Sequence, residues 1–273
     1  MSDSLQTGRF YGATQRRFEL GGVVLTEVAH LSGRKLPCHT HESAYFGLLL
    51  AGSYSEKCSH RAAEYDPFTM GFHPPSLTHS DEVGRCGSRM FCVELPDSYL
   101  SRTRPFLTVP QFTPDLCGSE VTWLGLRLYR SFANETLSPL ELEEACGDML
   151  ERVSGSRIHE EKTRPYWLNR ALELLHESYR ESLTLEEIAG QVGVHPIHLS
   201  RVFRKHYGRT MAEFMNRLRV QFACRALAAG WADLAIVASD AGFADQSHLG
   251  RVFKSCTGQT PGKFRSFFHS QLH

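Results

Sequence analysis

Four residues in the first third of the chain carry side chains suited to ligand or metal binding: His39, His41, Tyr45 and His79. Residues two apart in a strand point to the same face, so the imidazoles of His39 and His41 are expected side by side. Imidazole nitrogens bind divalent metals, and they also exchange hydrogen bonds with hydroxyl and carboxylate groups. The four residues therefore predict either a polar small-molecule pocket or a site for Zn²⁺, Fe²⁺ or Ni²⁺.

A second group of chemically active residues belongs to an internal repeat. The segment HLSRVFR at 198–204 recurs as HLGRVFK at 248–254, and the Gly and Thr that follow each copy also match. Upstream, IAxxVGV at 188–194 corresponds to VAxxAGF at 237–243. One supersecondary unit therefore occurs twice in the chain.

Each copy has the sequence pattern of a helix-turn-helix unit. A short helix, expected over 185–192 and over 234–241, ends at Gly193 or Gly242, which suits a cap with positive φ. The next helix is the one that enters the DNA major groove in this motif. The two units are expected over about 185–207 and 234–257.

The second helix of each unit has an apolar face and a polar face. Leu199 and Phe203 share one face in the first copy, and Leu249 and Phe253 share the equivalent face in the second. Arg suits bidentate contact with guanine or phosphate, and Ser and Gln suit contact with base edges. The predicted DNA-binding residues on the polar faces are Ile197, Ser200, Arg201, Arg204, Gln246, Ser247, Arg251 and Lys254. Gly250 on the same face permits close approach.

The repeat resembles the DNA-binding domain of the AraC/XylS family of bacterial regulators. The resemblance rests on AxxAGFxDxSxLxRxFK at 238–254, on GQTP at 258–261 and on Phe264-Arg265, and it covers about 164–267. It implies seven helices, with a long helix at about 211–229 joining the two units. It also implies double-stranded DNA and RNA polymerase as partners. His195 departs from the family pattern, in which Ser or Thr is common at the cap.

The spacing around the histidines resembles the cupin barrel. Gly33 precedes His39 by six positions, and Gly52 closes the motif after Tyr45. Metal-binding cupins use a Glu where this chain has Tyr45, and Phe68 stands where a second motif opens with Gly. The favoured interpretation is a pocket for a small-molecule effector lined by His39, His41, Tyr45 and His79, with no cofactor and no catalytic residue. The alternative is a metal-dependent cupin enzyme or metal sensor that uses His39, His41 and His79.

The elements that must position these residues divide the chain into halves. Short runs rich in β-branched and aromatic residues at 23–29, 45–51 and 89–95 predict strands, and apolar stripes at 121–132 and 139–153 predict helices. The expected fold is α+β, with a cupin-like β-barrel (jelly roll) over 1–118 and an all-α domain with two helix-turn-helix motifs over 165–273. Residues 119–155 are predicted as a helical dimerisation segment that makes a homodimer, and 156–164 as a linker.

Composition is that of an ordinary globular protein. Residues 164–273 hold 14 Lys and Arg against nine Asp and Glu, although the whole chain has zero net charge, so the basic half is the one expected to meet a polyanion. The chain has eight cysteines and no CxxC pair, and this pattern predicts reduced thiols. The absence of a long apolar run or signal-like segment predicts a cytoplasmic protein without membrane contact. The sequence thus predicts a non-enzymatic, ligand-responsive, DNA-binding transcription regulator.

Overall fold

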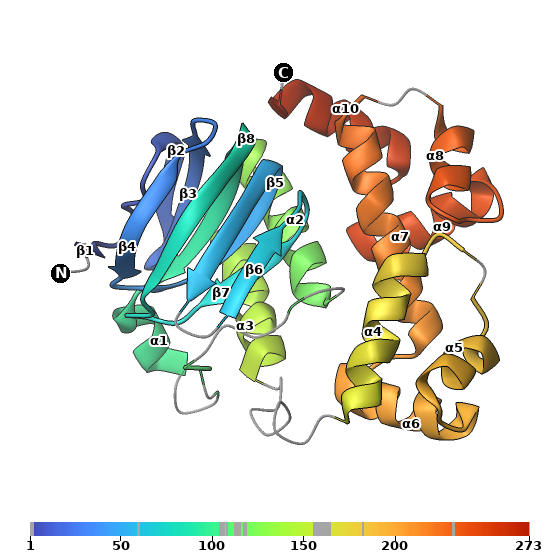
Figure 1. Cartoon of the computed structure of the whole chain (residues 1–273). Coiled ribbons are helices and arrows are strands. Elements are labelled where there is room, and N and C mark those ends of the chain that lie inside the picture. The colour runs from blue at the N-terminus through green and yellow to red at the C-terminus, as the bar shows by residue number, and fades with distance from the viewer. Residues whose placement is uncertain are drawn as a thin grey trace. The chain divides into compact units, whose positions relative to one another are not determined.

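The computed structural model describes residues 3–58, 61–103, 107, 109–111, 116, 119–154, 165–181, 183–230 and 233–272. The chain divides into two compact units, residues 1–156 and 157–273. Among the described residues, the first contains the sheet and three helices, and the second is helical (Figure 1). The α+β class predicted from sequence is confirmed. The predicted linker, 156–164, lies outside the described residues.

The first unit contains one mixed eight-stranded sheet. Its strands are β1 (Asp3–Leu5), β2 (Ala13–Leu20), β3 (Val23–His30), β4 (Lys35–His41), β5 (Ala44–Cys58), β6 (Arg61–Tyr65), β7 (Met70–His73) and β8 (His79–Leu95). The predicted strands at 23–29, 45–51 and 89–95 all occur, although the last two are only parts of the long β5 and β8.

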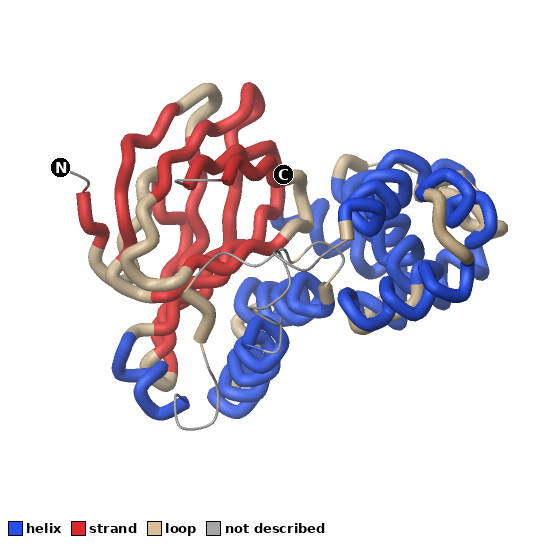
Figure 2. The backbone as a smooth tube through the Cα atoms, turned by 60° about the horizontal axis from the view of Figure 1, so that its bottom comes forward, coloured by secondary structure: helices blue, strands red, loops and turns tan. Residues whose placement is uncertain are grey.

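Strands β5 and β8 pair with each other along most of their length and cross a bend together. The register between them shifts near Leu49 and again between Gly52 and Tyr54. Before the bend, β5 also pairs with β7, and beyond it β5 pairs with β6. Strand β8 likewise pairs with β4 at one end and β3 at the other. The result is a curved half-barrel with an inner and an outer face (Figure 2).

Side chains alternate between the two faces of the sheet along the first half of β5, and both faces are buried. Tyr45 and Leu49 join the inner cluster with Tyr54, Val83, Met90 and Cys92. Phe46 and Leu48 belong to the other face and are fully buried. A continuous apolar run is the expected pattern for a strand that is covered on both sides.

Helix α2 (Glu120–Ala133) covers the outer face of the sheet, beside α3 (Pro139–Ser154), and α1 (Asp97–Thr103) follows β8. The ring of Phe91 in β8 lies 5.3 Å from Tyr129 and 5.1 Å from Phe132, centroid to centroid. Leu124 and Leu128 are consequently buried within this unit. Their apolar stripe is therefore covered within the unit, because the outer face of the sheet is itself apolar, and the role of 119–155 in a dimer stays a prediction.

The second unit contains seven described helices, the number that the family resemblance implied. They are α4 (Tyr166–Ser178), α5 (Leu185–Val192), α6 (Pro196–Tyr207), α7 (Met211–Ala228), α8 (Leu234–Asp240), α9 (Gln246–Thr257) and α10 (Pro261–Leu272). Phe203 packs edge-on against Phe214, and Phe253 against Phe264, so each half of the domain has its own aromatic core. No helix in the described part of the chain is both long and apolar enough to cross a bilayer.

Candidate nucleic-acid interface and histidine cluster

Helix α6 is the second helix of the first helix-turn-helix unit. Helix α5 begins with a capping box between Thr184 and Glu187 and ends at Gly193, which has φ of 71°. The cap of α6 is His195, whose Nδ1 accepts a hydrogen bond of 3.3 Å from the backbone N–H of Ile197. The departure from Ser or Thr at this position therefore preserves the cap.

Helix α9 occupies the equivalent place in the second unit. Helix α8 is followed by Gly242, which has φ of 81°, and the Asp245 carboxylate accepts a 2.6 Å hydrogen bond from the backbone N–H of His248. Both second helices thus begin with a side-chain cap and end at a left-handed glycine. The tandem helix-turn-helix architecture expected from the repeat is confirmed.

The two helices bury and expose the faces that their sequences predict. Leu199, Phe203, Leu249 and Phe253 have no exposed surface. The predicted DNA-binding residues lie on the opposite face, where Ser200 is half-buried and the other seven, Ile197, Arg201, Arg204, Gln246, Ser247, Arg251 and Lys254, are exposed. This exposure leaves them available for a partner, and their contacts with DNA stay a prediction.

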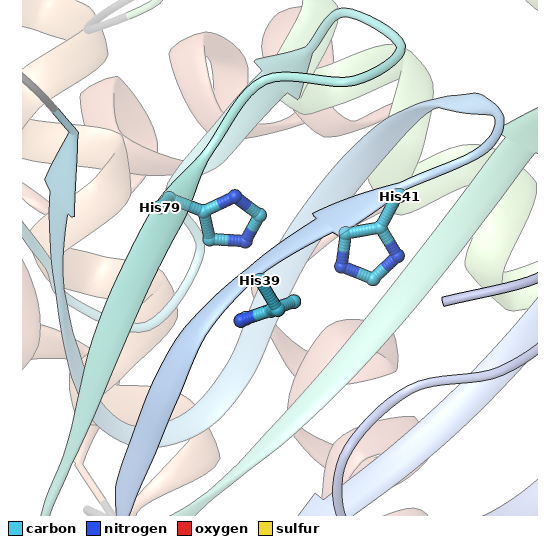
Figure 3. A group of neighbouring side chains, drawn as sticks. All are labelled: His39, His41 and His79. Atoms are coloured by element: carbon cyan, nitrogen blue, oxygen red, sulfur yellow. The ribbon is translucent and has the colours of Figure 1, made fainter. Parts of the chain in front are cut away.

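The predicted histidines come together on the inner face of the half-barrel. His39 and His41 lie on β4, and His79 begins β8 (Figure 3). The centroid of the His39 ring is 4.2 Å from that of His79 and 5.1 Å from that of His41. Tyr45 joins the group, with its ring 4.7 Å from His41. All four side chains are buried, whereas Cys38, between the histidines in sequence, is exposed on the other side of the strand.

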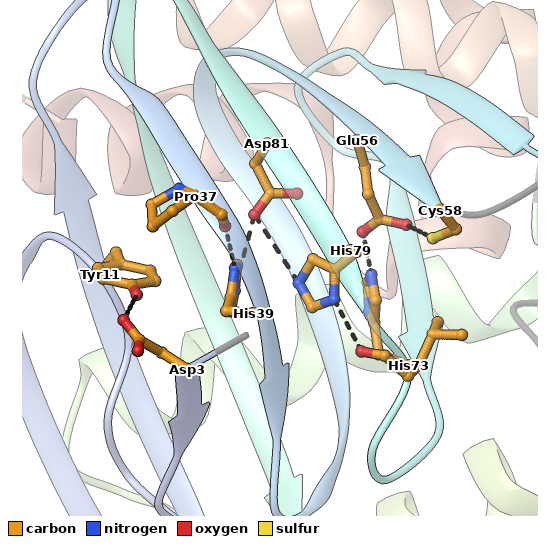
Figure 4. A network of polar contacts seen from close by, with 10 residues as sticks. Asp3, Tyr11, Pro37, His39, Glu56, Cys58, His73, His79 and Asp81 are labelled. Carbon is orange, nitrogen blue, oxygen red and sulfur yellow. Dashed lines mark hydrogen bonds and ion pairs between the residues drawn. The ribbon is translucent and has the colours of Figure 1, made fainter. Parts of the chain in front are cut away.

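Three further ionisable residues that the sequence did not point to belong to this cluster: Glu56 on β5, His73 on β7 and Asp81 on β8 (Figure 4). His73 Nε2 pairs with a carboxylate oxygen of Glu56, and Cys58 donates to the other oxygen at 3.0 Å. Asp81 Oδ2 lies 3.8 Å from Nε2 of both His39 and His79. Asp81 follows His79 by two positions, so strand alternation alone could have identified it.

Burial dominates the electrostatics of the cluster. It lowers the pKa of His41 to about 2 and, with the nearby His73, the pKa of His79 to about 4. Burial raises the pKa of Asp81 to about 7. Burial also acts to raise the pKa of Glu56, but the charge and hydrogen bond of His73 outweigh it, and that pKa falls to about 2. His41 and His79 are therefore neutral at pH 7 and keep a nitrogen lone pair for a ligand.

A small cavity adjoins the cluster. Its volume is about 20 Å³, which is enough for about one water molecule. The lining includes His39, His41, Tyr45 and His79, together with Phe10 and Tyr11 from the segment before β2. In this conformation the interior is too tightly packed for an organic ligand of ordinary size, which needs roughly 300 Å³ or more.

Comparison with known proteins identifies sequences that are similar to this chain. Residues 188–266 match the sequence family described as a helix-turn-helix domain. The bifunctional transcriptional activator/DNA repair enzyme AdaA of Bacillus subtilis (strain 168) is 32% identical over 99 residues, covering 36% of this chain and 47% of that protein. A putative AraC-like transcription regulator of Streptomyces lividans is 28% identical over 192 residues, covering 66% of this chain and 62% of that protein.

Among solved structures, ToxT from Vibrio cholerae O395 aligns with 90% of this chain and 98% of its own, at 10% identity and a TM-score of 0.39. The chain spans about half the length of the curated relatives it matches first.

The fold and the repeated unit define a class: a tandem helix-turn-helix domain in the same chain as a half-barrel of β-strands. The matched sequences show that the helical domain is similar to helix-turn-helix domains of transcription regulators, one of them named as AraC-like.

Proposed function

We propose that this chain is a sequence-specific, DNA-binding transcription regulator of the AraC type that acts in the cytoplasm. The observation that carries the proposal is the equivalent construction of α6 and α9. Each helix is capped, packs one apolar face inward and exposes an Arg at the same position, Arg201 or Arg251. A protein with two such basic, exposed helix faces can bind two segments of the DNA major groove.

Each exposed face combines groups that recognise bases with groups that bind phosphate. Arg201 and Arg251 suit guanine, while Ser200, Gln246 and Ser247 suit other base edges. Arg204 and Lys254, one turn further along, suit the backbone. Ile197, at 73% exposure, offers an apolar contact for a thymine methyl group. RNA polymerase is the further partner that regulation of transcription requires.

The half-barrel is the proposed sensor, and it responds to an effector bound near His39, His41, Tyr45 and His79. Buried ring nitrogens without a hydrogen-bond partner support this role: His41 Nδ1, His73 Nδ1 and His79 Nε2. Buried polar groups without partners are costly, and a bound ligand would supply the missing contacts. An organic effector requires the 20 Å³ cavity to widen, which gives the ligand a means of favouring one conformation over another.

A homodimer built on the helical segment 119–155 is the proposed assembly, and since Leu124 and Leu128 are buried within one chain, its contacts are expected at other side chains. Exposed apolar side chains in the first unit are the alternative contacts, and among them are Leu140 at 67% exposure and Phe18 at 46%. The alternative function is a metal-dependent enzyme of the cupin type. The regulator is favoured, because the tandem helix-turn-helix unit suits DNA binding and both cited relatives are named as regulators of transcription, although AdaA is also named as a DNA repair enzyme.

Selection from a random DNA library tests the proposal directly. Purified full-length chain should enrich one sequence with two conserved segments about one helical turn, roughly 10 bp, apart. The double variant Arg201→Ala/Arg251→Ala, checked for unchanged helix content by circular dichroism, should enrich none. A wild-type chain that enriches no sequence would refute specific DNA binding.

A further inference from the structure

Strand β2 forms one edge of the sheet, where it pairs with β3 alone among the described strands (Figure 1). It has eight residues, whereas the other described strands that pair on one side only, β1, β6 and β7, have three to five. Residues 13–19 of β2 are all exposed. An exposed edge strand offers a row of backbone N–H and C=O groups to another strand. The β2 edge is therefore the place where the sheet can be extended by a partner.

One part of β2 is regular enough for such pairing. The register with β3 shifts between Thr14 and Arg16, and a bulge of this kind protects an edge strand from association. From Arg16 to Leu20 the register is continuous. Phe18 is the middle residue of this stretch and is 46% exposed. An exposed aromatic ring at the centre of a regular edge favours association, so 16–20 is the stretch that a partner strand would pair with.

The charges of this stretch are complementary to those of a second copy of itself. Arg17 and Glu19 precede and follow Phe18, lie on the same face of the strand and are both exposed. If two copies of β2 pair antiparallel with the two Phe18 residues opposite each other, Arg17 of each copy lies opposite Glu19 of the other. Opposite charges in directly opposed positions stabilise an antiparallel pair, and like charges destabilise it.

Neighbouring registers lack this complementarity. Because side chains alternate, a pairing that keeps the same faces of the two sheets together is centred on one residue. A pairing centred on Arg16 or on Arg17 places two arginines opposite each other, and one centred on Glu19 places two glutamates opposite each other. Only a centre at Phe18 avoids like charges within 16–19. The charge pattern therefore selects one register for a second copy.

We propose that residues 16–20 of β2 pair antiparallel with the same residues of a second copy, so that two sheets join into one across a two-fold axis. The proposal rests on the homodimer proposed above and gives it a second contact besides the segment 119–155. Arg16 Nη1 donates a 2.9 Å hydrogen bond to the carbonyl oxygen of Ala133, so the β2 edge lies beside the C-terminal end of α2. Both contacts are thus compatible with one two-fold axis, in which each surface meets itself.

Sedimentation equilibrium of the full-length chain without DNA measures the dissociation constant of the dimer, so the result is independent of DNA binding. Glu19→Arg places two arginines opposite each other, and Arg17→Glu places two glutamates opposite each other. Each substitution should raise the dissociation constant by roughly tenfold or more, because two attractive pairs become repulsive. Glu64→Arg is the matched control, since it makes the same change at an exposed position of the edge strand β6 and should leave the constant unchanged.

A mixture of the two charge variants gives the sharper result. In an equal mixture of Glu19→Arg and Arg17→Glu chains, every arginine at these positions lies opposite a glutamate of the other chain, and wild-type association should return. Circular dichroism shows whether each variant is folded. Because Arg17 also lies over Gly8, Phe18→Asp is the second variant if Arg17→Glu does not fold. It places two carboxylates at the centre of the pairing and should also raise the constant by roughly tenfold or more.

The outcomes separate this contact from the homodimer itself. A wild-type dimer that folded Glu19→Arg and Phe18→Asp chains form equally well would overturn the pairing of β2 and leave the homodimer in place. A monomeric wild type would overturn both and leave the proposed DNA binding untouched. Folded charge variants that each dissociate but do not associate when mixed would overturn the register.

Amide hydrogen exchange shows what covers the edge. Alternate backbone N–H groups of an edge strand point away from its neighbour. Those of β2 should exchange more slowly as the protein concentration rises through the dissociation constant. Protection that is the same at every concentration would assign the edge to another segment of the same chain and overturn the proposal.

Discussion

Gly52 and Gly87 cross at the bend that β5 and β8 share, and a β-carbon at Gly52 would lie 1.9 Å from the carbonyl oxygen of Gly87. Both residues have positive φ, 80° and 75°. The register between the strands shifts between Gly52 and Tyr54. The contact between the two glycines therefore lies at the point where the sheet bends. His79 and Asp81 lie on one side of this bend, and Cys92 lies on the other.

The first prediction is that Gly52→Ala disrupts the bend. The substitution combines a strained backbone with an overlap against backbone, and each effect costs about 1–3 kcal/mol. Calorimetry of the full chain should show a lower melting temperature for the transition of the first unit, with that of the helical unit unchanged. Gly33→Ala is the control, because Gly33 also has positive φ but nothing lies within 4 Å of the added carbon. Equal effects of the two substitutions would show that the close contact is unimportant.

The bend also explains which part of the site could be predicted from sequence. His39 and His41 share a face because they are two apart, and this is independent of the rest of the fold. The approach of Glu56 and His73 depends instead on the register of β5 after two shifts and on its pairing with β7. Strand periodicity within one segment carries no information about such register, so these residues were missed.

The helical unit was more predictable because its interactions are local. The repeat, the glycine caps and the apolar faces predict α5 over 185–192, which is where it lies. The sequence is less informative about the surface that covers α2. An apolar stripe such as Leu124 and Leu128 shows that a helix face is buried, but not whether the covering surface belongs to the same chain.

A second prediction concerns Glu94, which is fully buried on β8. Its two oxygens accept hydrogen bonds of 2.9 and 2.8 Å from the backbone N–H of Gly8, but burial still raises its pKa from 4.5 to about 7. The folded state therefore holds a proton that the unfolded state releases above pH 4.5. This contribution to stability is complete below pH 4.5 and is lost as the pH rises towards 7.

Glu94→Gln should remove that dependence. The free energy of unfolding of the wild-type first unit should fall by roughly 2–3 kcal/mol relative to the variant between these two pH values. Urea titrations of both proteins below pH 4.5 and above pH 7 measure the difference. A difference between wild type and variant that is the same at both pH values would mean that the pKa of Glu94 is the same in the folded and unfolded states.

A third prediction separates the two recognition helices. Arg201→Ala and Arg251→Ala should each weaken binding to the selected DNA by about 1–3 kcal/mol. Because the residues lie on different helices, α6 and α9, footprints should show loss of protection at opposite ends of the site. Arg170→Ala is the control, since Arg170 is an exposed residue of α4 that pairs with Glu173 at 3.0 Å. Loss at the same end in both variants would contradict tandem binding.

The last prediction concerns Gly250, which lies inside α9 on the face that carries Arg251 and Lys254. Nothing in the described structure lies within 4 Å of a β-carbon added there, so packing within the chain does not require glycine. Glycine in a helix costs about 1 kcal/mol relative to alanine. If the position is needed for close approach of DNA, Gly250→Ala should stabilise the helical unit by about this amount and weaken binding to the selected DNA about tenfold, or 1.4 kcal/mol.

Gly190 is the matched control for Gly250. It is an exposed glycine inside α5 with nothing within 4 Å of an added β-carbon, and it lies on the first helix of its unit rather than the recognition helix. Gly190→Ala should therefore raise the melting temperature to a similar extent and leave DNA affinity unchanged. Thermal melts measure the stability of the two variants, and mobility-shift titrations measure their affinity for DNA. Both are run in one buffer, because salt alters DNA affinity. If Gly250→Ala binds DNA as tightly as Gly190→Ala, the groove leaves room for a side chain at this position, and Gly250 has no part in recognition.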